Sequence, residues 1–190
     1  AVAAAQPVAV QTRKIGTRKS QLHVPLRPAS SKPVAGRCYP DSSILRIGIH
    51  TSIGGSLDKA AARAQELGAN TFQIFSASPR MWRAGMPDPS AIRRMRELRE
   101  RHDLTPLVIH DNYLINLASA DRLIRRKSIA AFRGEMERAI AIGAEYLVAH
   151  PGNYKGQSLE EGIVNLVRGL GEAAAGLEPG NLTLLLENTA

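Results

Sequence analysis

The sequence predicts an α/β protein built on part of a TIM, or (β/α)8, barrel. From residue 44 onward, short apolar runs of strand length alternate with amphipathic stretches of helix length. This alternation is typical of a parallel sheet with right-handed crossovers. Two helix-to-strand junctions are nearly alike, namely Glu66-Leu-Gly-Ala-Asn70 and Ala141-Ile-Gly-Ala-Glu145. Residues of metal-ligand type follow several strands, at the edge where barrel enzymes carry their sites.

An open, doubly wound sheet is the competing arrangement. The first strand is followed by His50-Thr-Ser-Ile-Gly-Gly55, which lacks the spacing of a dinucleotide-binding glycine motif, so the barrel is favoured. Five strands cannot close an eight-stranded barrel. We therefore expect an incomplete barrel, with about five of its eight β/α units in residues 44–190 and the rest beyond them.

The elements follow from hydrophobic spacing. In the first helix Leu57, Ala60 and Ala64 share an apolar face. Ser56 is placed to cap its start, and Gly68 to end it. The last helix is expected to bury a stripe made of Leu159, Ile163, Leu166, Val167 and Leu170. We expect strands at 45–50, 71–75, 106–110, 145–150 and 182–187, and helices at 57–67, 89–102, 121–142 and 159–175.

The first 43 residues differ from the rest in composition. They hold seven of the 25 Lys and Arg residues but one of the 17 acidic residues, and they lack periodic hydrophobicity. We expect a disordered basic N-terminal extension. A transit peptide and a nucleic-acid-attracting arm are possible explanations, but a non-native or upstream-extended terminus is favoured. Residues 44–190 are nearly balanced in charge, so the overall basicity is weak evidence for nucleic-acid binding.

Composition also limits the setting of the protein. The single cysteine, Cys38, excludes an internal disulfide, and no apolar run reaches the ~20 residues of a membrane helix. We expect a cytoplasmic protein, with organellar targeting by the N-terminal extension as the lesser alternative.

Four strand ends carry residues that bind metal well. His50, His110, His150 and Glu187 end the first, third, fourth and fifth expected strands. Imidazole and carboxylate ligands suit Zn²⁺ or a similar divalent ion, which would lower the pKa of a bound water and supply hydroxide. One such histidine alone is more often structural, but several together favour a site. Asp111 either orients His110 or caps the turn, and both remain open.

The loops after the second and third strands open on the same face. They carry Arg80 and Trp82, and Tyr113 and Leu114. Arginine and exposed apolar side chains can enter a DNA groove and wedge between bases, although ordinary loop packing explains Trp82 and Leu114 equally well. The arginines between Arg93 and Arg101 lie on an outer helix face, where we expect a solvated surface.

Several of these segments together resemble the bacterial endonuclease IV family. They include Gly48-Ile-His50-Thr-Ser-Ile-Gly-Gly55, Pro79-Arg80-Met-Trp82, His110-Asp-Asn-Tyr113-Leu-Ile-Asn-Leu117, His150-Pro-Gly152 and Leu186-Glu187-Asn-Thr189. The resemblance runs colinearly over about residues 45–190.

The resemblance implies a TIM barrel with three zinc ions that acts in base excision repair. Such enzymes cut duplex DNA on the 5′ side of abasic sites and leave a 3′-hydroxyl and a 5′-deoxyribose phosphate. The family's metal ligands fall on His110 and His150, and its bridging carboxylate on Glu187. The arginine and tyrosine that enter the damaged duplex fall on Arg80 and Tyr113, and Leu114 lies beside them. His50 matches a histidine near the family's site.

The resemblance also limits what this chain is expected to do. It has ligands for about one of the three ions, so we expect residues 1–190 to be inactive or nearly so, and the full-length protein to be an active monomer. Two alternatives remain, a metal-dependent sugar isomerase or epimerase of the same barrel class and a non-catalytic DNA-binding fragment.

Overall fold

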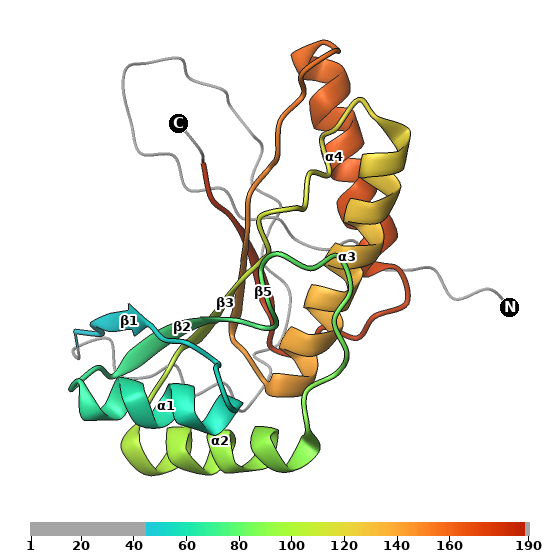
Figure 1. Ribbon diagram of the computed structural model, residues 1–190. Coiled ribbons are helices and arrows are strands. Elements are labelled where there is room, and N and C mark those ends of the chain that lie inside the picture. The colour runs from blue at the N-terminus through green and yellow to red at the C-terminus, as the bar shows by residue number, and fades with distance from the viewer. Residues whose placement is uncertain (1–44, 189–190) are drawn as a thin grey trace, which may run out of the picture. The chain divides into compact units, whose positions relative to one another are not determined.

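A five-stranded parallel sheet forms the centre of the computed structural model, which describes residues 45–188 (Figure 1). Each strand pairs with its neighbours in the chain, in the order β1-β2-β3-β4-β5. The alternation of strands and helices is as predicted, while the expected basic extension at 1–43 lies outside the described residues. The strands are β1 (Gly48–His50), β2 (Thr71–Phe75), β3 (Leu107–His110), β4 (Tyr146–Ala149) and β5 (Thr183–Leu186); the helices are α1 (Leu57–Glu66), α2 (Pro89–His102), α3 (Arg122–Ile142) and α4 (Leu159–Ala174).

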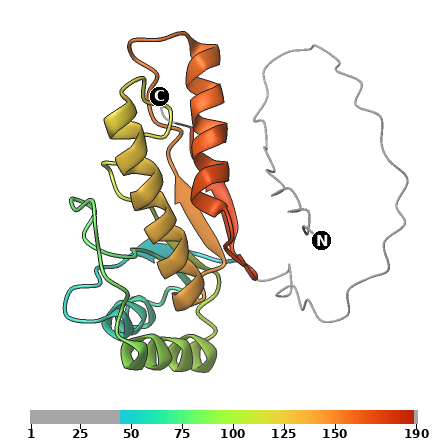
Figure 2. The same ribbon diagram turned by 90° about the vertical axis from the view of Figure 1, so that its right-hand side faces the viewer.

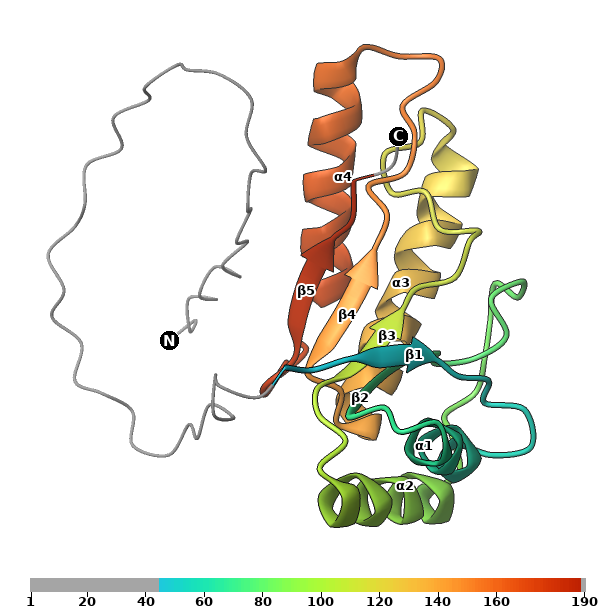
Figure 3. The same cartoon turned by 90° about the vertical axis from the view of Figure 1, so that its left-hand side faces the viewer.

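The two faces of the sheet have different roles. One face carries buried apolar side chains such as Phe72, Ile74 and Leu107, which form the core with the helices. Because successive side chains of a strand point to opposite faces, Gln73 and Phe75 point the other way. Figure 3 views the sheet from this second face, with α3 and α4 behind the strands. The strand-end residues reach the site from here.

Helix ends follow the sequence signals with one exception. Gly68 and Gly143 have φ angles of 74° and 81°, the left-handed conformation that ends α1 and α3. Asp88 and Asp121 cap the starts of α2 and α3 with their side chains. Ser56 precedes α1 as predicted, but its side chain makes no capping hydrogen bond to the helix.

Helix α4 lies beside α3 (Figure 2), and only part of its predicted apolar stripe is buried. Its glycines, Gly162 and Gly169, are buried, and a Cβ atom at Gly169 would lie 3.2 Å from Leu117. Ile163 and Val167 are more than half exposed. The predicted burial was therefore wrong for Leu159, Ile163 and Val167, whereas Leu166 and Leu170 are partly buried against the core as predicted.

The arginines of α2 are not all solvated. Arg96 donates to the carbonyl oxygens of Ala141 (2.7 Å) and Ile142 (3.2 Å) at the end of α3. Arg99 forms an ion pair with Glu145 at 2.6 Å and is only 10% exposed. It also donates to the carbonyl oxygen of Gly143, so these two arginines bind the last carbonyl groups around the end of α3, which have no partner inside the helix.

No helix in the described part of the chain is long and apolar enough to cross a membrane.

Candidate metal site and loop cluster

Three predicted ligands meet at the carboxyl edge of the sheet. His110 ends β3, and His150 and Glu187 follow β4 and β5 directly. The Nε2 atoms of the two histidines are 3.2 Å apart. The nearer carboxylate oxygen of Glu187 lies 3.4 Å from Nε2 of His110 and 3.9 Å from Nε2 of His150. Parallel strands in register bring these residues together although about 40 positions separate each of them from the next in the chain.

The spacing of the three atoms fits a tetrahedral metal ion. Zinc bonds of 2.0–2.1 Å at tetrahedral angles place two ligand atoms about 3.3 Å apart. The two shorter distances, 3.2 and 3.4 Å, lie close to this value. Two imidazoles and one carboxylate are also a donor set that suits zinc. The donor set of His110, His150 and Glu187 therefore fits one divalent ion.

His110 is already oriented for this role. Its Nδ1 lies 2.9 Å from the backbone oxygen of Asp111, which can only accept, so Nδ1 carries the proton. In the neutral ring Nε2 is then the acceptor atom, and it is the one directed at His150 and Glu187. The ring is only 12% exposed. The backbone oxygen of Asp111 thus fixes the orientation of the His110 ring, and Oδ1 of Asp111 lies 3.7 Å from the same Nδ1 atom.

The Asp111 side chain lies behind the site and is nearly inaccessible. It is 1% exposed, and its Oδ2 atom has no hydrogen-bond partner among the described residues. Burial, and to a smaller degree repulsion by Glu135, raises the pKa of Asp111 to about 8. The group is therefore largely protonated at neutral pH.

A cleft of about 270 Å³ opens beside the three ligands. It is lined by His50, Gln73, Phe75, His110, Tyr113 and His150. His50 lies 2.9 Å from the amide nitrogen of Gln73 and packs on the Phe75 ring. Burial, and then the proximity of His110, lowers the pKa of His50. His50 belongs to the cleft but not to the three-atom cluster, in agreement with its predicted place near the site.

Gln73 and Phe75 were not predicted as site residues. The signal was present, because strand alternation places both on the face opposite the buried Phe72 and Ile74. The ring of Phe75 lies between those of His50, His110 and Tyr113, at centroid distances of 4.6, 5.8 and 5.4 Å. It therefore connects the strand-end histidines to the loop after β3.

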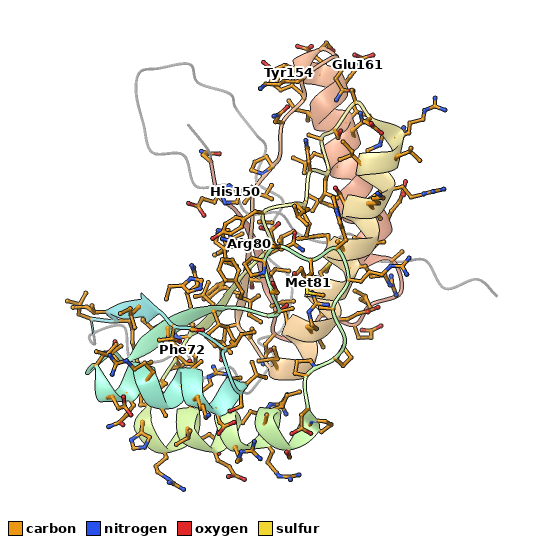
Figure 4. The ribbon with its side chains drawn as sticks, in the orientation of Figure 1. Phe72, Arg80, Met81, His150, Tyr154 and Glu161 are labelled. Carbon is orange, nitrogen blue, oxygen red and sulfur yellow. The ribbon has the colours of Figure 1, made fainter. Side chains whose placement is uncertain are left out.

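The loops after β2 and β3 lie against each other near the cleft. The backbone N–H of Tyr113 donates to the carbonyl oxygen of Pro79 at 3.3 Å, so Tyr113 and Arg80 are neighbours across the two loops. Both side chains are exposed, and Leu114 is half-buried. Figure 4 marks Arg80 in the loop after β2 and His150 at the end of β4. Trp82 is partly buried against the core, which agrees with ordinary packing.

Comparisons with known proteins agree with this arrangement. Residues 61–190 match the family model described as "Xylose isomerase-like TIM barrel". The chain is 64% identical over 146 residues to "Probable endonuclease 4" of Solibacter usitatus, covering 77% of this chain and 50% of that protein. The resemblance to endonuclease IV is therefore confirmed.

Solved structures also bear out the predicted fold. The crystal structure of endonuclease IV from Thermus thermophilus matches with a TM-score of 0.67 and 36% identity, over 76% of this chain and 52% of that one. D-psicose 3-epimerase from Clostridium cellulolyticum H10 matches with a TM-score of 0.55 and 17% identity, over 75% and 52%, which shows a shared fold alone. The chain spans about half the length of the curated relatives it matches.

Proposed function

We propose that this chain, which belongs to the xylose isomerase-like TIM-barrel family, is part of an endonuclease that cuts duplex DNA on the 5′ side of abasic sites and leaves a 3′-hydroxyl. The observation that carries the proposal is the convergence of His110, His150 and Glu187 beside two exposed loop residues, Arg80 and Tyr113. The 64% identity to a probable endonuclease 4 supports it.

In the proposed reaction the strand-end residues form one metal subsite. His110 and His150 would contribute Nε2 atoms to the ion, and Glu187 a carboxylate oxygen. Zn²⁺ held there would supply a Lewis acid that lowers the pKa of water and stabilises the negative charge of the phosphodiester. The chain's own contribution is to fix the three donors at this spacing through β3, β4 and β5.

The proposed role of the loops is to recognise damage. A nucleotide without a base stacks poorly, so moving it out of the helix costs less than moving an intact one. The Arg80 guanidinium, the Tyr113 ring and the half-buried Leu114 side chain would fill the opened step. Selection would then depend on how easily the duplex deforms and not on its sequence.

A zinc titration tests the metal subsite. We expect purified 1–190 to bind about one Zn²⁺ per chain, and His110→Ala to lower the affinity at least about 100-fold, because one of three protein donors is lost. His102→Ala is the matched control, since His102 is an exposed histidine at the end of α2. Elemental analysis after dialysis gives the stoichiometry. Equal zinc content in the His110 and His102 variants would reject the site.

A DNA assay tests the substrate. We expect 1–190 with added zinc to bind an abasic-site duplex more tightly than the intact duplex, but to cleave it slowly or not at all. Tyr113→Ala should reduce the preference, whereas Arg101→Ala, an exposed arginine of α2, should not. Turnover by 1–190 equal to that of a full-length relative would contradict the proposed incompleteness of the metal cluster.

We also propose that the full-length protein is a cytoplasmic monomer, which size-exclusion chromatography and cell fractionation test.

The sugar isomerase or epimerase alternative shares the fold and the metal-ligand types. The exposed Arg80 and Tyr113 favour a duplex, since a sugar enzyme needs a small closed pocket. Epimerisation of a ketohexose by the zinc-loaded or manganese-loaded protein would favour the alternative. A non-catalytic DNA-binding fragment would bind intact and abasic duplexes equally, with an affinity that falls steeply with salt.

A further inference from the structure

A buried ion pair lies inside α3, at positions where a surface helix normally carries solvated residues. Glu135 is 2% exposed and Arg138 is 5% exposed. A guanidinium nitrogen of Arg138 lies 3.0 Å from a carboxylate oxygen of Glu135. Replacing a buried pair by apolar residues of similar volume is often neutral or stabilising, so the pair is not explained by stability alone.

The ion pair forms hydrogen bonds with both ends of the segment from Ser76 to Ala84, in the loop after β2. Nε of Arg138 donates to the Ser76 hydroxyl at 2.7 Å, and the same hydroxyl donates to Glu135. Ser76 is the first residue after β2, and it is 4% exposed. A second guanidinium nitrogen of Arg138 donates to the carbonyl oxygen of Ala84 at 3.3 Å. The loop that carries Arg80 is therefore fastened to α3 on both sides of that residue.

The same pair reaches the loop after β3 through Asn112. The amide nitrogen of Asn112 lies 3.5 Å from Glu135 and 3.4 Å from the carbonyl oxygen of Met81. Its amide oxygen accepts the backbone N–H of Leu114 at 2.9 Å. Asn112 is 6% exposed and immediately precedes Tyr113. One buried network therefore contacts the residues on either side of Tyr113 as well as the segment that contains Arg80.

We propose that Glu135 and Arg138 are positioning residues, which hold the loops after β2 and β3 in the relative geometry that Arg80 and Tyr113 need to enter damaged DNA. The inference rests on the proposed function for its DNA part. The pair touches neither the strand-end ligands nor the cleft directly. It acts through Ser76, Asn112 and two backbone carbonyl oxygens, and it is a polar link between these loops and the helix layer.

Trp82, the only tryptophan of the chain, reports on this arrangement without DNA. It stands between Met81 and Ala84, whose carbonyl oxygens accept from Asn112 and Arg138. The test variant combines Ser76→Ala, Glu135→Met and Arg138→Met, which removes the network without leaving a buried charge. Arg138→Lys is the second variant, because it keeps the charge but loses the branched geometry that reaches Ser76 and Ala84 together.

The matched control is Arg133→Met on the same helix. Arg133 pairs with Glu137 and donates to the carbonyl oxygens of Ala173 and Ala175 at the end of α4, far along the chain from either loop. Acrylamide quenching of Trp82 fluorescence is measured in the full chain, together with far-UV circular dichroism. We expect quenching to rise about twofold or more in the triple variant and in Arg138→Lys, with the helix signal retained, and to stay unchanged in Arg133→Met.

Binding to abasic and intact duplexes completes the experiment. We expect the ratio of the two affinities to fall about tenfold in the two loop variants and to stay constant in Arg133→Met. Unchanged quenching in a folded variant overturns the inference, and so does increased quenching with an unchanged ratio. If the unmodified chain shows no preference for abasic DNA, the proposed function fails, while the quenching result still decides whether the pair holds the loops.

Discussion

Two clusters of charged and polar side chains lie close to each other but satisfy their atoms in opposite ways. Beneath the loops, Glu135, Arg138 and Ser76 pair donor with acceptor inside the protein, and each is less than 6% exposed. At the sheet edge, His110, His150 and Glu187 bring three acceptor-type atoms together, and Glu187 is 53% exposed. A closed network fixes structure, whereas converging acceptors at an open edge are suited to a cation.

Polar residues in the closed network and in the open cluster affect different properties of the protein. Removing one member of the closed network leaves a buried charge without a partner, which costs free energy of folding. Removing one member of the open cluster relieves a crowding of acceptors and costs binding instead. Substitutions in the two clusters should therefore give opposite results in stability and in metal affinity.

The largest effect is expected for Glu135→Leu. The substitution leaves the Arg138 guanidinium unpaired in a nearly inaccessible position, so the free energy of unfolding should fall by about 3–5 kcal/mol. Urea unfolding followed by circular dichroism measures it. Glu137→Leu is the control, because Glu137 lies on the same helix but is 42% exposed in its pair with Arg133, and it should change stability by less than about 1 kcal/mol. Equal losses of unfolding free energy in the two variants would contradict the distinction between the two clusters.

A smaller effect is expected for Asp111, which lies between the two clusters. Burial raises its pKa to about 8 from the 3.8 of an unperturbed aspartate. The folded state therefore holds a proton that the unfolded chain releases between these values, so the contribution of Asp111 to stability is most favourable below pH 4 and becomes less favourable as pH rises toward 8. Asp111→Asn should remove this slope and stabilise the metal-free protein at pH 8 by about 2–3 kcal/mol, after allowance for solvent relaxation.

Unfolding of the wild type and Asp111→Asn at pH 5 and pH 8.5, with a chelator present, measures the difference. The two proteins should differ more at pH 8.5 than at pH 5. A parallel dependence on pH in both would show that Asp111 ionises normally despite its burial.

The smallest effect on stability is expected for Glu187→Gln. Glu187 is half exposed, so in a chelator the variant should unfold within about 0.5 kcal/mol of the wild type. Added Zn²⁺ should then raise the melting temperature of the wild type but not of the variant, because a ligand stabilises only the state that binds it. Glu178→Gln, an exposed carboxylate before β5, should keep the zinc response. A zinc response retained in Glu187→Gln would remove Glu187 from the cluster.

The open cluster could be predicted from the sequence, while the closed one could not. Parallel strands bring their carboxyl ends to one edge, so the sequence predicts that His110, His150 and Glu187 lie close together. Glu135 and Arg138 lie in a helix among other charged residues, and charge alone predicts a solvated face. Their burial depends on where the loop after β2 lies, which periodicity does not describe. The hydrogen bonds of Arg96 and Arg99 to carbonyl oxygens at the end of α3 were not predicted, for the same reason.

Helix α4 shows a related limit. Hydrophobic spacing correctly indicated Leu166 and Leu170, which pack against the core, but it also predicted burial of Ile163 and Val167, which are exposed. Close approach needs small residues, and the buried Gly162 and Gly169 provide it. Helix α4 thus packs through small residues as well as through bulky apolar ones. The spacing of bulky apolar residues does not reveal the small ones.

The strand order also bears on how this part of the chain folds. Because the sheet runs β1-β2-β3-β4-β5, every strand pairing spans a single helix and none waits for a distant segment. Each new strand can therefore pair with the edge strand of the preceding β/α unit while the chain is being synthesised. His110 would be in place before His150, and His150 before Glu187. The three side chains would thus assemble in the order of synthesis, and their cluster would form only when β5 joins the sheet.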